Sequence, residues 1–183
     1  YISIGLFLHD NALSADQPVF TVIVSAHNES ERISSCLDSI LQQKYPKTKL
    51  EIIIVNDRST DNTGIILSKY EKQHNNVTVI NIDKLKAGIS PKKNAINQAV
   101  LASKGEIIAN TDADCIVKKD WLANIAAYFT QNTDMVIGLS PLQPTSWYLS
   151  ICMSIDAIVG TVIAYGTFGW NHAVACTGRN FSY

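Results

Sequence analysis

Several features are scarce or missing in this chain of 183 residues, and each absence removes a class of function. Its four cysteines (Cys36, Cys115, Cys152 and Cys176) are widely spaced and form no Cys-x-x-Cys pair. We therefore expect buried free thiols in a reducing compartment rather than a zinc ribbon or a disulfide framework. The formal net charge is −1, from fifteen Lys and Arg against sixteen Asp and Glu. Because binding to a phosphate backbone requires clustered positive charge, we expect no nucleic-acid partner.

Three common sequence motifs are also absent. No Gly-x-Gly-x-x-Gly follows the first apolar run, and the chain contains neither a Gly-x-Ser-x-Gly elbow nor a Walker lysine loop. These absences argue against hydride transfer on a dinucleotide, esterase chemistry and ordinary phosphate-loop hydrolysis.

Long uninterrupted apolar runs are lacking as well. Residues 1–8 are apolar but far fewer than the roughly 20 that a spanning helix needs, and they lack the features of a signal peptide. They fit the end of a transmembrane helix and a stray strand equally well. Residues 151–169 form a longer apolar stretch, but Asp156 and several glycines favour an interfacial or core helix. Because the chain starts at Tyr1 rather than Met, we expect it to be part of a longer protein.

What the chain does have is enough apolar material for a core, with 46% hydrophobic and 17% charged residues. Short β-branched runs alternate with segments whose apolar residues recur at helical spacing, such as Ile33, Cys36, Leu37 and Ile40. This rhythm predicts an α/β fold, with a mostly parallel sheet covered by helices on both faces. The predicted strands are 20–24, 52–55, 77–80, 106–109 and 135–137, and the predicted helices are 33–45, 60–70, 91–100 and 121–129.

The sequence also suggests where these helices begin. We expect Asn28, with Glu31 three residues later, to cap the first helix, and Thr60 to cap the second. Pro91 suits the first turn of the third helix.

Polar residues follow the predicted strands at their carboxyl ends. Asn28 and Glu29 follow the first strand, Asp57 the second, and Asp112 and Asp114 the fourth. Parallel α/β sheets bind ligands outside these ends, at a point where the strand order switches. This coincidence predicts a ligand site there.

The Asp112-Ala113-Asp114 sequence is the sharpest of these features. Hard cations such as magnesium and manganese bind carboxylate oxygens and often complete their coordination with substrate phosphates. The alternative is a solvated turn, because aspartate is common after strands.

The other polar candidates also have two interpretations each. Asp57 and Glu29 could bind a ligand or serve as helix caps. Lys92 and Lys93 oppose the dipole of the third helix, which a bound diphosphate would offset, but both could simply be solvated. His27 is weak evidence for a metal site because no other histidine or cysteine accompanies it.

Four motifs, in this order, resemble those of family 2 glycosyltransferases. They are Val-Ile-Val-Ser-Ala-His-Asn-Glu29, Glu-Ile-Ile-Ile-Val-Asn-Asp-Arg-Ser-Thr-Asp-Asn-Thr63, Lys92-Lys-Asn-Ala95 and Asn-Thr-Asp-Ala-Asp114. The likeness covers residues 18–139 and extends to 176–183, which look like the family's Gly-x-Asn stretch. It implies a GT-A (Rossmann-like) fold with an incomplete C-terminal part. The expected ligands are a nucleotide-diphosphate sugar, commonly a UDP sugar, and a divalent ion, Mg²⁺ or Mn²⁺.

The resemblance also implies roles by position. The nucleotide-sugar pocket would comprise Ala26, His27, Asn28, Glu29, Asp57, Lys93, Asn94, Asp112, Ala113 and Asp114. Within it, Asp57 would meet the base, Lys93 and Asn94 would lie near the diphosphate, and Asp112 and Asp114 would hold the metal. The Lys93–Asn94 match is looser, because Ser-Pro-Lys-Lys departs from the family's usual pattern. Gly178, Arg179 and Asn180 would shape the donor-sugar or acceptor side.

Such enzymes invert the anomeric centre, with a carboxylate that removes the acceptor proton. That base is expected beyond Tyr183, so we expect this chain to bind nucleotide weakly at most and to transfer nothing by itself.

The apolar ends resemble membrane-associated members of the family, whose acceptor is a lipid or a saccharide. This resemblance predicts that the protein lies at the cytoplasmic face of a membrane. The expected divisions are 1–17 (a flank), 18–140 (the nucleotide-sugar-binding core) and 141–183 (the start of an acceptor part). A nucleotidyltransferase and a non-catalytic nucleotide-sugar-binding domain are the alternatives.

Overall fold

The computed structural model describes residues 2–3, 17–84, 88–129, 133, 135–137 and 181–183. The elements in chain order are β1 (Ile2–Ser3), β2 (Phe20–Ala26), α1 (Ile33–Leu41), the 3₁₀ helix η1 (Lys47–Lys49), β3 (Leu50–Asp57), α2 (Thr63–Gln73), β4 (Val77–Ile82), α3 (Pro91–Ala102), β5 (Ile107–Asp112), α4 (Trp121–Tyr128), β6 (Met135–Ile137) and β7 (Phe181–Ser182). The predicted alternation of strands and helices is confirmed, and so is the α/β fold class.

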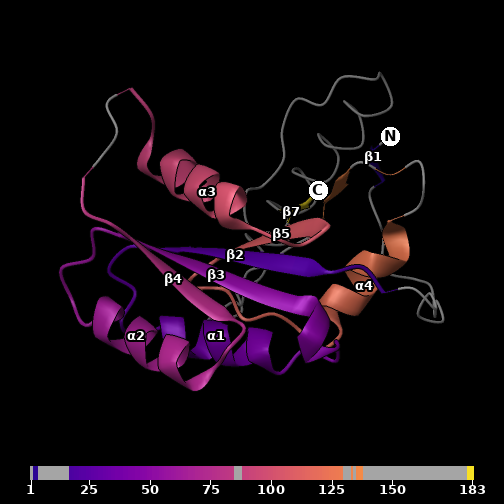
Figure 1. Ribbon diagram of the computed structural model, residues 1–183, viewed down its shortest axis with the longest axis horizontal. Helices are drawn as coiled ribbons and strands as arrows, with labels where there is room; N and C mark the ends of the chain where they lie inside the picture. Colours follow the sequence, from indigo (N-terminus) through magenta and orange to yellow (C-terminus); the bar gives the residue numbers. More distant parts are fainter. Residues whose placement is uncertain (1, 4–16, 85–87, 130–132, 134, 138–180) are drawn as a thin grey trace, which may run out of the picture.

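The strands form one sheet in the order β1-β6-β7-β5-β2-β3-β4 (Figure 1). The pairs β2–β3, β3–β4, β2–β5 and β1–β6 are parallel, while the short β7 lies antiparallel between β5 and β6. From β2 the chain builds outward through β3 to β4 and then returns to place β5 on the other side of β2. The strand order therefore switches between β2 and β5.

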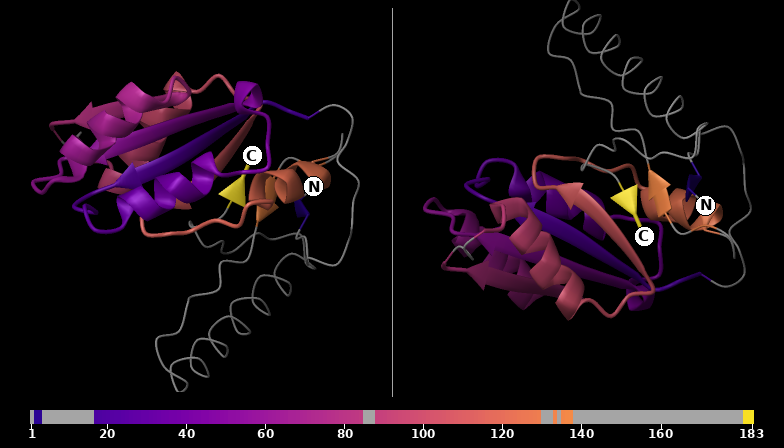
Figure 2. Two further views of the ribbon diagram at one scale, coloured as in Figure 1. Left: turned by 90° about the horizontal axis from the view of Figure 1, so that it is seen from below. Right: turned by 90° about the horizontal axis from the view of Figure 1, so that it is seen from above.

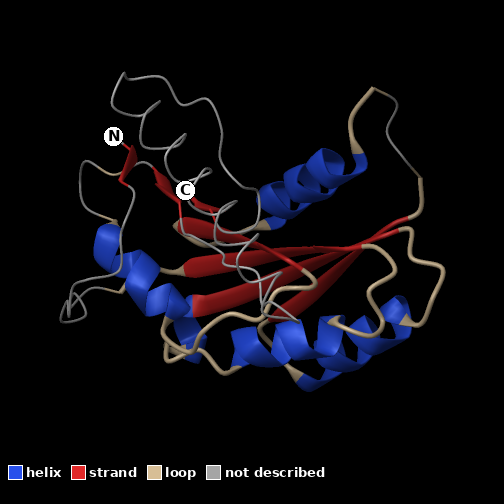
Figure 3. Cartoon of the chain, turned by 180° about the vertical axis from the view of Figure 1, so that it is seen from behind, coloured by secondary structure: helices blue, strands red, loops and turns tan. Residues whose placement is uncertain are grey.

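Helices cover both faces of the sheet, as Figure 2 shows with α1 and α2 over one face and α3 over the other. The view from behind in Figure 3 shows the same layers. On the α1 and α2 face, Ile33, Leu37 and Ile40 join Leu67 and the side chains of alternate strand residues in one apolar cluster. The opposite face packs Ala95 and Ala99 of α3 against a second cluster. Since β3 contributes to both clusters, its predicted burial on both faces is confirmed.

Two predicted helix caps are wrong. Helix α1 begins at Ile33 with Arg32 at the N-cap, and α2 begins after Asn62, and neither N-cap residue makes a side-chain cap hydrogen bond. The Asn28 side chain instead accepts a hydrogen bond from the backbone N–H of Thr60, in the neighbouring loop. Pro91 does lie in the first turn of α3, where Ser90 accepts a hydrogen bond from the Lys93 N–H.

Some predictions fall outside the described residues. They concern the apolar stretch 151–169, the cysteines Cys152 and Cys176, and the site residues Gly178, Arg179 and Asn180. The proposed divisions of the chain at residues 17 and 140 remain predictions. Among the helices that the structure describes, none is long and apolar enough to cross a membrane.

Candidate functional site

The predicted site residues meet at the carboxyl end of β2. Parallel pairing sets Ser25 beside Asp112 of β5 on one side and Ala26 beside Asn56 of β3 on the other. Asp57 and Asp112 therefore flank the end of β2, in the two strands next to it. This is the edge at which the strand order switches, where ligands of parallel sheets bind.

The loop after β2 is locked to the loop after β3. Asn28 adopts a left-handed backbone conformation, with φ 55°, and its N–H donates to Ser59 Oγ at 3.0 Å. Its side-chain oxygen accepts from the Thr60 N–H at 2.8 Å. Asparagine tolerates this conformation better than most residues. The reciprocal bonds fix the backbone that leads to Glu29.

Asp61 extends the same connection. Its carboxylate accepts hydrogen bonds from the Ser30 N–H at 3.1 Å and from the Thr63 hydroxyl at 2.6 Å. These bonds, the one from the Thr63 hydroxyl above all, hold the pKa of the Asp61 carboxyl well below its usual value. Thr63 Oγ1 in turn accepts from the Glu29 N–H at 2.9 Å. The backbone of Glu29 is thus positioned by the start of α2.

Three carboxylates share the region next to this loop. Burial raises the pKa of the Glu29 carboxyl, and repulsion from Asp114 and, more weakly, from Asp61 and Asp112 raises it further, while Arg32 lowers it. A divalent cation bound nearby would relieve this repulsion, and magnesium and manganese commonly use only one or two protein carboxylates. In the part of the chain that the structure describes, no group of three or more His, Cys, Asp or Glu side chains is placed to hold a metal ion.

Asp57 is nearly buried and paired with its neighbour. Arg58 donates to its two carboxylate oxygens, from Nε at 2.8 Å and from Nη2 at 3.2 Å. Arg58 also has φ 55°, an unusual conformation for a residue with a long side chain. The His27 ring donates from Nδ1 to the Asp57 carbonyl at 2.6 Å, so that His27 bridges the ends of β2 and β3. This contact gives His27 a positioning role.

The first turn of α3 places the side chain of a lysine against one of these carboxylates. Lys92 Nζ lies 2.6 Å from Asp112 Oδ1. Lys93, which the resemblance pointed to, is exposed, and Asn94 is buried against the rest of the fold. The sequence allowed Lys92 to be either a solvated residue or a phosphate ligand, and it did not predict the contact with Asp112. The only signal was the position of Lys92 in the first turn of a helix that starts at the carboxyl edge of the sheet.

The two cysteines Cys36 and Cys115 contact the backbone of Asp112. Cys36 Sγ donates to the Asp112 carbonyl at 3.5 Å, and the Cys115 N–H donates to the same oxygen at 3.1 Å. Burial raises the pKa of the Cys36 thiol to about 12 and raises that of Cys115 as well. Both thiols are therefore protonated and unreactive at neutral pH. Both cysteines are free, and Cys36 is buried as predicted, whereas Cys115 is only partly buried.

Gln43 holds the segment that follows Asp114, and sequence reasoning missed it. Its side chain is buried, donates to the Lys118 carbonyl at 2.7 Å and accepts from the Leu122 N–H at 3.0 Å. Leu122 lies in the first turn of α4, whose N-cap residue Asp120 makes no side-chain cap bond. Gln43 thus caps α4 from the end of α1, and no local pattern in the sequence reveals it.

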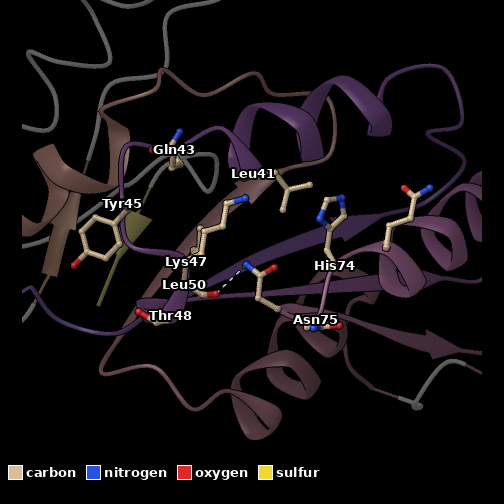
Figure 4. Close-up of a pocket in the computed structure, with 10 residues that line it drawn as sticks. Leu41, Gln43, Tyr45, Lys47, Thr48, Leu50, His74 and Asn75 are labelled. Carbon is tan, nitrogen blue, oxygen red and sulfur yellow. Dashed lines mark hydrogen bonds between the residues drawn. The ribbon is translucent and has the colours of Figure 1, made fainter.

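A cavity of about 320 Å³ lies at the opposite edge of the sheet (Figure 4). It is lined by residues near the amino ends of β3 and β4, among them Lys47, Leu50, His74 and Asn76. No predicted site residue and no carboxylate lines it, so it lacks the carboxylates that magnesium and manganese commonly bind. We therefore place the candidate site at the carboxyl edge.

Comparison with known proteins identifies the family to which this chain is similar. The model of the family Glycosyl transferase family 2 matches residues 21–161. Among solved structures, PcManGT, a mannosyltransferase from Pyrobaculum calidifontis in complex with GDP-Man and Mn²⁺, is 30% identical with a TM-score of 0.62. The match covers 78% of this chain and 41% of that one. Residues 1–349 of TarS from Staphylococcus aureus, in complex with UDP-GlcNAc, are 28% identical with a TM-score of 0.56, over 69% of this chain and 37% of that one.

Curated relatives give the same result. TarS is named poly(ribitol-phosphate) beta-N-acetylglucosaminyltransferase and is 30% identical over 64% of this chain and 20% of its own length. Beta-monoglucosyldiacylglycerol synthase from a Synechocystis species is 32% identical over 69% of this chain and 26% of its own length. The chain thus spans less than two thirds of the relatives that it matches.

Proposed function

Because this chain belongs to glycosyl transferase family 2, with the GT-A fold, we propose that it is the donor-binding part of a glycosyltransferase. The enzyme would transfer a sugar from a nucleotide diphosphate to a saccharide or lipid acceptor. The observation that carries this proposal is the convergence of Glu29, Asp57 and Asp112 around the end of β2, at the switch point of the sheet.

Asp57 is the proposed contact for the base. Its carboxylate is held from one side by Arg58 and can accept a further hydrogen bond from a ring N–H. Uracil and guanine both present such a group, in keeping with UDP-GlcNAc and GDP-Man bound to two relatives. We propose a UDP sugar, with Ala26, His27 and Asn28 lining the same pocket.

Asp112 and Asp114 are the proposed metal ligands, with Ala113 between them. Magnesium and manganese commonly use one or two protein carboxylates and complete their shell with substrate phosphates and water. The two carboxylates present therefore fit the group, as does the Mn²⁺ in the PcManGT complex. When bound, the ion would neutralise the charge that develops on the leaving diphosphate. Lys93 and Asn94, in the first turn of α3, would lie on the diphosphate side.

Transfer itself is proposed to invert the anomeric centre and to need a base from beyond Tyr183. The acceptor is proposed to be a saccharide or a lipid, since relatives are named for poly(ribitol phosphate) and for a glucosylated diacylglycerol. A lipid acceptor and the apolar stretch 151–169 would place the enzyme at the cytoplasmic face of a membrane. Gly178, Arg179 and Asn180 would then border the donor sugar or the acceptor.

Calorimetric titration of UDP into the chain tests the donor site. We expect binding with Mn²⁺ that EDTA abolishes, with GDP and ADP as the competing bases. Asp114→Ala should remove the metal dependence, whereas Asp120→Ala, an exposed aspartate without a cap bond, should leave binding unchanged. Metal-dependent affinity that survives in Asp114→Ala would refute the metal assignment. If the folded chain binds no nucleotide, the same titration on the full-length protein decides between an incomplete pocket and a non-catalytic domain.

A further inference from the structure

Lys92 forms an ion pair with Asp112, one of the two carboxylates that we propose as metal ligands. Its Nζ donates to Asp112 Oδ1 at 2.6 Å, with the lysine side chain half exposed and that of Asp112 about one fifth exposed. Lys92 also lies in the first turn of α3, where the helix dipole disfavours a positive charge. The helix dipole therefore destabilises the charged Lys92 side chain, and the ion pair with Asp112 offsets this destabilisation.

We propose that Lys92 is a resident counter-cation of Asp112, which a divalent ion must displace. This inference rests on the proposed function, because it concerns the same carboxylates. Before the donor arrives, the ammonium holds the Asp112 side chain in place and reduces its repulsion with Glu29. When the ion and the diphosphate bind together, the ammonium exchanges Asp112 for the phosphate oxygens. Lys92 is thus a positioning residue that couples the two ligands.

The physical argument is competition for one carboxylate. A magnesium ion needs an oxygen at about 2.0–2.1 Å, and an ammonium at hydrogen-bond distance from the same carboxylate repels it. Without nucleotide, the ion must displace Lys92, which then has no anionic partner. With nucleotide, the diphosphate supplies that partner, so the same displacement costs less. Metal and nucleotide should therefore strengthen one another's binding, and by the same factor.

Lys92→Gln separates this role from that of an ordinary surface ion pair. Manganese resonance measures free Mn²⁺ in titrations of the chain, first alone and then with saturating UDP. We expect Lys92→Gln to bind Mn²⁺ alone about tenfold more tightly than wild type, and the strengthening by UDP to shrink by a similar factor. A tenfold change corresponds to about 1.4 kcal/mol. Because Lys92 is half exposed, the variant should fold, and a melting curve confirms this.

Lys104→Gln is the matched control. It removes the same charge beyond the far end of α3, at the amino edge of the sheet, where the Lys104 N–H bonds Glu51. We expect it to leave Mn²⁺ binding unchanged. A gain confined to Lys92→Gln supports the proposal, and an equal gain in both variants overturns it, because net charge alone would then explain the effect.

Failure of the inference is distinguishable from failure of the proposed function. If wild type binds UDP with Mn²⁺ but Lys92→Gln matches it in both titrations, the counter-cation role is wrong and the donor site stands. If Lys92→Gln binds Mn²⁺ alone more weakly, Lys92 only orders Asp112 and the competition is refuted. If no variant binds Mn²⁺ with or without UDP, both the metal site and the inference are wrong.

Discussion

Replacing Gln43 with methionine tests the connection between α1 and the segment that carries Asp114. Gln43 is 8% exposed, and its side chain makes three hydrogen bonds. It donates to the carbonyls of Ser39 at 3.1 Å and Lys118 at 2.7 Å, and it accepts from the Leu122 N–H at 3.0 Å. Methionine has a similar volume, so the apolar packing is largely kept and the polar contacts alone are lost.

The expected cost follows from the groups left behind. The Leu122 N–H and the Ser39 carbonyl lose the partner that Gln43 supplies, and an unsatisfied buried group costs about 1–3 kcal/mol. The Lys118 carbonyl loses only an additional bond, because it also accepts from the Trp121 N–H at 3.0 Å. We therefore expect the free energy of unfolding to fall by about 3 kcal/mol, a large part of the total of about 5–15 kcal/mol for a typical domain.

Urea denaturation followed by circular dichroism measures this change. The matched control is Gln42→Met, because Gln42 is adjacent but exposed. It should change the free energy of unfolding by no more than about 0.5 kcal/mol. A loss below about 1 kcal/mol in Gln43→Met, with the control unchanged, would refute the reasoning. It would mean that water replaces the lost bonds or that α4 is held by other contacts.

Three further predictions concern backbone space, charge and strain. Gly105→Ala should lower the free energy of unfolding by about 3 kcal/mol in urea, because its Cβ would lie 2.4 Å from the backbone nitrogen of Thr21 in a central strand; near-native stability would contradict this. Glu29→Gln should stabilise the fold at pH 7, since the raised pKa means that the ionised carboxyl disfavours folding. That gain should disappear as the pH falls through the raised pKa to the usual 4.5, and a gain independent of pH would exclude this cause. Arg58→Gly should be more stable than Arg58→Ala by about 1 kcal/mol in thermal melts, because φ is 55° there; the reverse order would mean that the residue leaves this conformation.

The predicted elements were confirmed where hydrophobic periodicity is strong. Strand β3 shows why, because its continuous apolar run is buried on both faces and no helix pattern competes with it. The buried stripe of α1 begins at Ile33 and includes Cys36 and Leu37, as the helical spacing predicted. Both patterns are local, since each depends only on which neighbouring residues must leave water.

The helix caps were wrong because their side chains have partners far away in the sequence. Both the backbone N–H and the side-chain hydroxyl of Thr60 donate to Asn28 Oδ1, so that the two predicted caps bond each other across 32 residues. A capping pattern considers only the next few residues, and here the facing loop offered equally good donors. The short strand β7 is a similar case, because two residues carry no periodicity and pairing with β5 and β6 alone defines them.

The sequence by itself determined the α/β class, the family and the identity of the acidic residues at the strand ends. These properties follow from local periodicity and from ordered motifs. Only the tertiary structure decided that β2 lies between β3 and β5, which brings Asp57 and Asp112 to either side of one loop. It also decided that Lys92 rather than Lys93 reaches Asp112. Strand order and the direction of a helical side chain depend on how distant segments pack, and no local pattern encodes that packing.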